Sequence, residues 1–130
     1  MSKTILLVDD DEAHVMWSRE ILSQHGYDVD SANSARKGLE MLNDKNYDLI
    51  ISDLMMPEMT GIDFMKEASK IRRGQKAIIM TGHGDVNSFI ESMYGIGALE
   101  YIVKPVETED FIAMVDKLTS SPPTDIGLSA

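Results

Sequence analysis

The chain has 130 residues, enough for one domain that buries a sizeable core. Its 22 acidic and 12 basic residues give a formal net charge of −10, which argues against direct nucleic-acid binding because that needs a basic face for the phosphates. The chain lacks cysteine, which excludes disulfides and thiolate metal sites. The start leaves no room for a signal peptide, and no apolar run is long enough to span a membrane. We therefore expect a cytoplasmic protein without membrane contact.

The apolar pattern predicts five strands that alternate with five helices. The strands are short apolar runs, except for an alternating second one that is typical of a sheet edge, and they are expected at residues 4–8, 28–31, 49–53, 77–80 and 101–103. Helical spacing and turn signals predict five helices. The first spans residues 12–25, the second begins after a cap at Asn33 or Ser34, and the third lies between Thr60-Gly61 and Arg72-Arg73-Gly74. The fourth runs from a cap at Asp85 to Gly95, and the fifth from about Thr108 to Leu118. This alternation predicts an α/β fold with a doubly wound parallel sheet.

The domain is expected to end with the last helix. Residues 1–118 form the predicted domain, and residues 119–130 begin with Thr-Ser-Ser-Pro-Pro-Thr, a composition typical of a tail or the start of a linker. No internal repeat is visible.

Two carboxylates, Asp9 and Asp10, directly follow the first strand, and a helix follows them. Asp is favoured near a helix N-terminus, and this accounts for Asp11 and Glu12 as a cap and first turn. Capping does not need two further carboxylates against the strand end, where like charges raise one another's pKa. A hard divalent cation relieves that repulsion, and Mg²⁺ prefers oxygen ligands. Together with Asp53, this pair predicts a magnesium site.

Asp53 ends the apolar run at residues 49–53, and ligands bind beyond the carboxyl ends of such strands. An aspartate that faces a bound cation is a candidate nucleophile toward phosphorus. Phosphoryl transfer asks mainly for positioning and for positive charge around the equatorial oxygens. Lys104 follows the fifth strand and offers a second charge, and Thr81 follows the fourth and offers a hydroxyl. Pro105 permits a cis bond that turns Lys104 inward.

These motifs resemble the receiver domain of bacterial two-component response regulators. The resemblance covers about residues 4–118 and rests on five separated motifs in register: Asp9-Asp10, Asp53, Met56-Pro57, Thr81-Gly82 and Lys104-Pro105. It implies a flavodoxin-like fold of the receiver type and a phosphoacceptor signalling role in a phosphorelay. The resemblance also implies that the domain is not an enzyme in the ordinary sense, because receiver domains catalyse only their own phosphorylation and dephosphorylation.

The resemblance also implies a role for each site residue. Asp53 accepts a phosphoryl group from a sensor histidine kinase or a phosphotransfer protein. Asp10, Asp53 and the backbone carbonyl of Met55 bind Mg²⁺ directly, and Asp9 acts through water. The phosphoryl oxygens contact Lys104.

A switch is implied as well. Thr81 moves toward the phosphoryl group and Tyr101 turns inward, which couples the site to the face of the fourth helix, fifth strand and fifth helix. That face would contact a downstream effector protein or a C-terminal effector domain. The fifth helix carries acidic residues instead of the arginines of receivers that dimerise through charge pairs there, so we do not predict that dimer.

In this family the residues two positions past the phosphoacceptor and two past the threonine flank the path of the hydrolytic water. They are Met55 and His83 here. Met55 is apolar and flexible and is expected to obstruct that water.

Two other functions remain open. Asp9-Asp10-Asp11 contains the D-x-D of haloacid-dehalogenase-like phosphatases, with Asp9 as nucleophile, but Ala13 stands where that motif has Thr or Val. A flavodoxin-like binding module needs a Ser/Thr/Gly-rich phosphate loop after the first strand, where this chain has carboxylates that would repel a phosphate. Which aspartate becomes phosphorylated separates the first alternative from the receiver.

Overall fold

The computed structural model describes residues 2–82 and 99–120 of the chain. His83, the predicted cap Asp85 and the predicted fourth helix lie outside the described residues, as does most of the predicted tail.

Five parallel strands form one sheet, which confirms the predicted fold class. Their spatial order is β2-β1-β3-β4-β5. The strands are β1 (Thr4–Val8), β2 (Asp28–Ala32), β3 (Leu49–Asp53), β4 (Ala77–Thr81) and β5 (Leu99–Val103). The predicted edge strand, β2, does lie at an edge and is one residue longer than expected.

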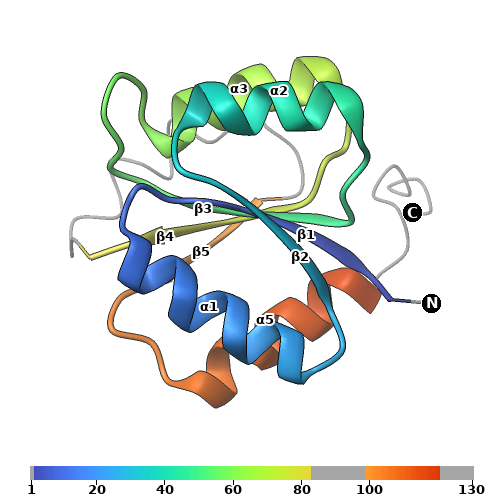
Figure 1. Ribbon diagram of the computed structural model, residues 1–130, viewed down its shortest axis with the longest axis vertical. Coiled ribbons are helices and arrows are strands. Elements are labelled where there is room, and N and C mark those ends of the chain that lie inside the picture. Colours follow the sequence, from blue (N-terminus) through green and yellow to red (C-terminus); the bar gives the residue numbers. More distant parts are fainter. Residues whose placement is uncertain (1, 83–98, 121–130) are drawn as a thin grey trace.

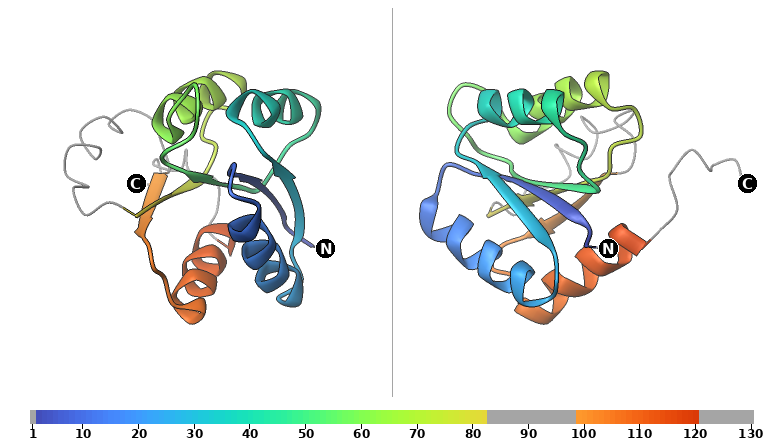
Figure 2. Two further views of the ribbon diagram at one scale, coloured as in Figure 1. Left: turned by 60° about the vertical axis from the view of Figure 1, so that its left-hand side comes forward. Right: turned by 45° about the vertical axis from the view of Figure 1, so that its right-hand side comes forward.

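Four helices are described, and they cover the sheet in pairs. They are α1 (Glu12–Gln24), α2 (Ala35–Asp44), α3 (Gly61–Ile71) and α5 (Thr108–Ser120). Figure 1 shows α2 and α3 on one face of the sheet and α1 and α5 on the other, and the turned views of Figure 2 show the same two layers. In the described ranges no helix is long and apolar enough to cross a membrane.

The helix ends follow side-chain chemistry. Asp11 caps α1 by accepting hydrogen bonds from the amides of Ala13 and His14, as predicted. Ser34, rather than Asn33, caps α2. The predicted end of the first helix at residue 25 is one residue late, because His25 is the C-cap that follows Gln24.

Each face of the sheet has its own apolar core, because successive strand residues point to opposite sides. Leu6, Val8 and Ile50 pack toward α2 and α3, and Phe64 of α3 is fully buried among them. On the other face, side chains of β1, β3 and β4 pack against α1 and α5, where Phe111 is fully buried. These two cores hold the strands rigidly from both sides, and with them the loops at the strand ends.

Candidate functional site

The carboxyl ends of β1, β3, β4 and β5 meet at one edge of the sheet. The strand order reverses beside β3, since β1 pairs with β2 on one side and with β3 on the other. Such a switch point is where open α/β sheets bind ligands. Apart from Tyr101, which lies within β5, the predicted site residues that the structure describes lie at or just after the ends of these four strands.

Three predicted metal ligands come together there. Asp9, Asp10 and Asp53 each offer an oxygen within 4.8 Å of the others. Asp9 is 5% exposed, Asp53 is half-buried and Asp10 is exposed. The cluster thus runs from the interior of the domain to solvent. Its oxygen donors suit a hard divalent cation such as Mg²⁺.

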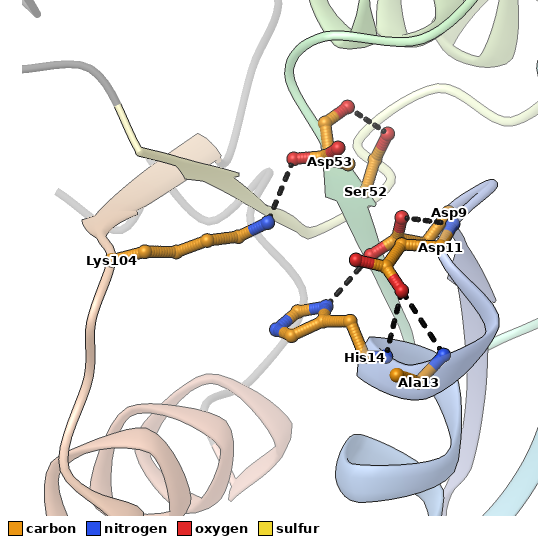
Figure 3. A network of polar contacts seen from close by, with 7 residues as sticks. All are labelled: Asp9, Asp11, Ala13, His14, Ser52, Asp53 and Lys104. Carbon is orange, nitrogen blue, oxygen red and sulfur yellow. Dashed lines mark hydrogen bonds and ion pairs between the residues drawn. The ribbon is translucent and has the colours of Figure 1, made fainter.

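Both carboxylate oxygens of Asp9 have partners inside the protein (Figure 3). Oδ1 accepts a hydrogen bond from the Asp11 amide at 2.9 Å, and Oδ2 lies 2.7 Å from Nδ1 of His14. Because an ionised carboxylate only accepts, Nδ1 of His14 carries the hydrogen. Burial raises the pKa of Asp9, but these hydrogen bonds outweigh burial and hold the pKa below its ordinary value. Asp9 is therefore a fixed anion.

Asp53 pairs with Lys104 across the site. Figure 3 shows the lysine side chain reaching from the end of β5 to the end of β3, with Nζ 3.1 Å from Oδ1 of Asp53. Burial raises the pKa of Asp53, against the lowering effect of Lys104, and the nearby charge of Asp9 raises it further. The Lys104–Pro105 peptide bond is cis.

The other predicted residues lie around this cluster. Thr81, at the end of β4, is 1% exposed, and its backbone carbonyl accepts a hydrogen bond of 2.7 Å from the Lys104 amide. Met55 is 52% exposed in the loop after β3. Tyr101, on β5, is 39% exposed.

The sequence did not reveal that His14 belongs to the site. The His14 side chain is partly buried, with 20% of it exposed. Its ion-pair distance to Asp9 was not anticipated. The ring also stacks on Trp17, with centroids 5.7 Å apart, and Trp17 in turn packs against Phe111. The spacing from Asp9 was the available signal, because a helix that starts at Glu12 places its third residue next to the strand end.

Comparison with known proteins gives a consistent result. The family model described as the response regulator receiver domain matches residues 5–116. The transcriptional regulatory protein ZraR of Escherichia coli K12 is 35% identical over 113 residues, which are 87% of this chain and 25% of that protein. The chain thus spans a quarter of the length of that relative. The chemotaxis protein CheY of Thermotoga maritima is 32% identical over 120 residues, which are 92% of this chain and 99% of that protein.

Solved structures agree in fold. A CheY-like receiver domain protein from Methanospirillum hungatei superposes with a TM-score of 0.85 at 32% identity, covering 92% of this chain and 95% of that one. The response regulator TrrA of Thermotoga maritima, solved in complex with Mg²⁺-BeF, gives a TM-score of 0.80 at 30% identity, with 89% and 98% covered.

Proposed function

Because this chain belongs to the family of response regulator receiver domains, which are signalling domains that interact with histidine kinases, we propose that Asp53 is its phosphoacceptor. The donor is a phosphohistidine on a sensor kinase or a phosphotransfer protein. One observation carries the assignment: Nζ of Lys104 meets Oδ1 of Asp53 at 3.1 Å, beside a cluster of carboxylates. A cation and a metal-type ligand set around one half-buried carboxylate are what phosphoryl transfer requires.

The proposed reaction is an in-line displacement. An oxygen of Asp53 supplies the electron pair for the new P–O bond. The P–N bond to the donor imidazole breaks, and the imidazole leaves with the electron pair of that P–N bond and takes up a proton. Partial burial of Asp53 removes part of the water shell that would otherwise compete with attack. Lys104 then holds the transferred phosphoryl oxygens, and the chain catalyses this step only on itself.

Receiver domains generally bind Mg²⁺ at an acidic pocket. We propose that Mg²⁺ binds this chain at the carboxylate cluster, with Asp10, Asp53 and the carbonyl of Met55 as direct ligands. Asp9 acts through water in this scheme, and its geometry supports that role because both of its oxygens already accept hydrogen bonds from the protein. When bound, the ion would supply positive charge that stabilises the charge on the phosphoryl group. The TrrA relative was solved with Mg²⁺-BeF, which is consistent with such a site.

The proposed switch links Asp53 to the surface. The hydroxyl of Thr81 moves toward the phosphoryl group, and the ring of Tyr101 turns from its partly exposed position into the space that Thr81 leaves. The face of the predicted fourth helix, β5 and α5 would then present a different surface to an effector protein or effector domain. A cytoplasmic location stays a prediction.

The same contacts disfavour Asp9 as the nucleophile of a phosphatase. Each of its two oxygens already accepts a hydrogen bond, one from His14 and one from the Asp11 amide, and the residue is 5% exposed, so in-line attack by Asp9 is disfavoured. Asp53, in contrast, is bound on one oxygen by the cation that a phosphoryl group needs.

Intact-mass spectrometry tests the function. With a small acyl phosphate and Mg²⁺ the wild-type chain should gain one phosphoryl group, and the gain should disappear when the metal is chelated. Asp53→Asn should gain none. Asp48→Asn, which removes a carboxylate at the opposite end of β3, should react like wild type. Equal labelling of Asp53→Asn and wild type would refute the assignment.

A further inference from the structure

A second pocket lies at the other end of the sheet. It has a volume of about 410 Å³ and opens where the strands begin, between the residue before β1, the α2–β3 loop, the α3–β4 loop and the end of α5. Figure 1 shows the start of β1 and the last turn of α5 on the same side of the molecule, opposite the edge where α1 begins. This pocket is separated from Asp53 by the length of the strands.

Positive charge gathers at this pocket. Its lining contains four basic residues and one acidic residue: Lys3, Arg72, Arg73, Lys76 and Asp48. These are four of the 12 basic residues in a chain with a net charge of −10. The one carboxylate is engaged elsewhere, because Oδ2 of Asp48 accepts hydrogen bonds from the amide and the hydroxyl of Thr4 at 2.8 and 3.2 Å. The acidic chain thus concentrates cations where few carboxylates balance them.

Three of these cations have no acidic partner in the part of the chain that the structure describes. Lys3, Arg72 and Arg73 make no ion pair there. Nη1 of Arg72 donates only a long hydrogen bond of 3.3 Å to the carbonyl of Ile71, and its buried Nε has no hydrogen-bond partner among the described residues. Arginine side chains without an acidic partner match an anion that accepts several hydrogen bonds.

The walls of the pocket are held in place by hydrogen bonds. Nε2 of the buried Gln75 donates to the carbonyl of Tyr47 at 3.2 Å, which joins the α3–β4 loop to the α2–β3 loop. Nζ of Lys76 donates to the carbonyl of Leu118 at 2.9 Å, which joins the same loop to α5. Gly74, with φ of 75°, makes the turn between Arg73 and these anchors. These hydrogen bonds hold the loops that carry the basic residues in place.

We propose that this pocket binds a small phosphate-bearing molecule. Arginine forks bind phosphate oxygens bidentately, and the volume lies in the range of small-molecule sites. The acidic charge of the whole chain repels anions in general, so attraction at this place must come from the four local cations. The phosphate group is the recognised chemistry, whether it belongs to free phosphate or to a nucleotide.

Amide chemical shifts of the full chain, followed by NMR without Mg²⁺, test this site. Inorganic phosphate and a nucleoside monophosphate are the two probes. Each should give saturable shifts centred on residues 72–76 and residues 46–48, with those after Asp53 unaffected. Arg73→Glu should weaken both affinities at least tenfold. Lys37→Glu, the same charge change on the exposed face of α2, should keep them within twofold of wild type.

The two probes separate the sources of the phosphate. Tighter binding of the nucleoside monophosphate assigns the pocket to a nucleotide, and equal binding assigns it to the phosphate group alone. Three results would overturn the proposal: no saturable shifts with either probe, equal loss of affinity in Arg73→Glu and Lys37→Glu, or shifts confined to the surroundings of Asp53.

Discussion

Asp9 and Asp53 belong to one cluster, yet their pKa values move in opposite directions. Burial raises both, but Asp9 has two hydrogen-bond donors that reverse the effect, whereas the single cation on Asp53 does not. This difference supports two different proposed roles. Asp9 stays ionised as a support, and Asp53, the proposed phosphoacceptor, has Lys104 on one of its oxygens.

His14 should act by positioning Asp9. His14→Ala removes the partner of Oδ2, so Asp9 gains rotational freedom and Mg²⁺ affinity should fall severalfold, as expected when an outer hydrogen bond to a metal site is lost. Isothermal titration calorimetry measures this. His25→Ala is the matched control, because that exposed ring follows the opposite end of α1 and its Nδ1 lies 3.0 Å from the carbonyl oxygen of Ile21. Equal Mg²⁺ affinities of His14→Ala and wild type would show that the contact is only packing.

Met55 should slow loss of the phosphoryl group. Its side chain is 52% exposed two residues after Asp53, where a flexible apolar group obstructs a hydrolytic water without orienting it. Met55→Asn should speed dephosphorylation severalfold and leave Mg²⁺ affinity unchanged, because only the backbone carbonyl is proposed as a ligand. Single-turnover decay of phosphorylated wild type and variant measures both rates. Unchanged or slower decay in Met55→Asn would contradict this role.

At the scale of elements, Gly61 sets how closely α3 approaches the end of β3. A Cβ at this position would lie 2.5 Å from the backbone oxygen of Asp53 and 3.1 Å from Cα of Leu54, so a side chain forces backbone to move. Gly61→Ala should lower the free energy of unfolding by about 1–3 kcal/mol and slow phosphorylation of Asp53. Gly82→Ala is the control for stability, since no described atom lies within 4 Å of its Cβ. Urea unfolding of both variants decides, and a Gly61→Ala chain as stable as wild type would refute this account.

The edge strand β2 contacts the residues that follow α2 through the carboxylate of Asp30, and this contact depends on pH. The hydroxyl of Tyr47 donates to Oδ2 of Asp30 at 2.7 Å, and Nζ of Lys45 lies 3.1 Å from the same oxygen. The Tyr47 hydrogen bond is the main reason that the pKa of Asp30 lies below its ordinary value. A lowered folded pKa means that the contact stabilises the fold above the ordinary carboxyl pKa and is lost as the pH falls through the folded value.

Tyr47→Phe should therefore cost stability mainly near neutral pH. The expected loss is about 1 kcal/mol, because Asp30 is partly exposed and solvent screens the contact. Thermal unfolding between pH 3 and 7 should show that the difference in stability between wild type and Tyr47→Phe becomes smaller as the pH falls. A difference that stays constant with pH would mean that the tyrosine contributes by packing alone.

At the scale of the molecule, the sequence predicted which residues meet at the carboxyl edge of the parallel sheet. Polar residues that follow apolar runs had to meet at one edge, so the convergence of Asp9, Asp10, Asp53 and Lys104 was foreseeable. The pairing of His14 with Asp9 was not, because it depends on how α1 is rotated against the strand, which the packing of Trp17 on Phe111 sets in three dimensions.

The basic pocket was equally invisible in the sequence. Its basic residues come from segments far apart in the chain, and the net charge of −10 gives no sign that they gather in one place. Arg72-Arg73-Gly74 was interpreted only as the end of a helix, which it also is. Residues that meet at the starts of strands carry no common pattern comparable to a polar group after an apolar run.

The most direct test of the account is the position of the phosphoryl group. The chain, treated with a small acyl phosphate and Mg²⁺, is digested at acid pH and its peptides are sequenced by fragmentation mass spectrometry. The account predicts one acid-stable, alkali-labile phosphoryl group on Asp53. A phosphoryl group on Asp9, or on any residue outside the cluster, would contradict it.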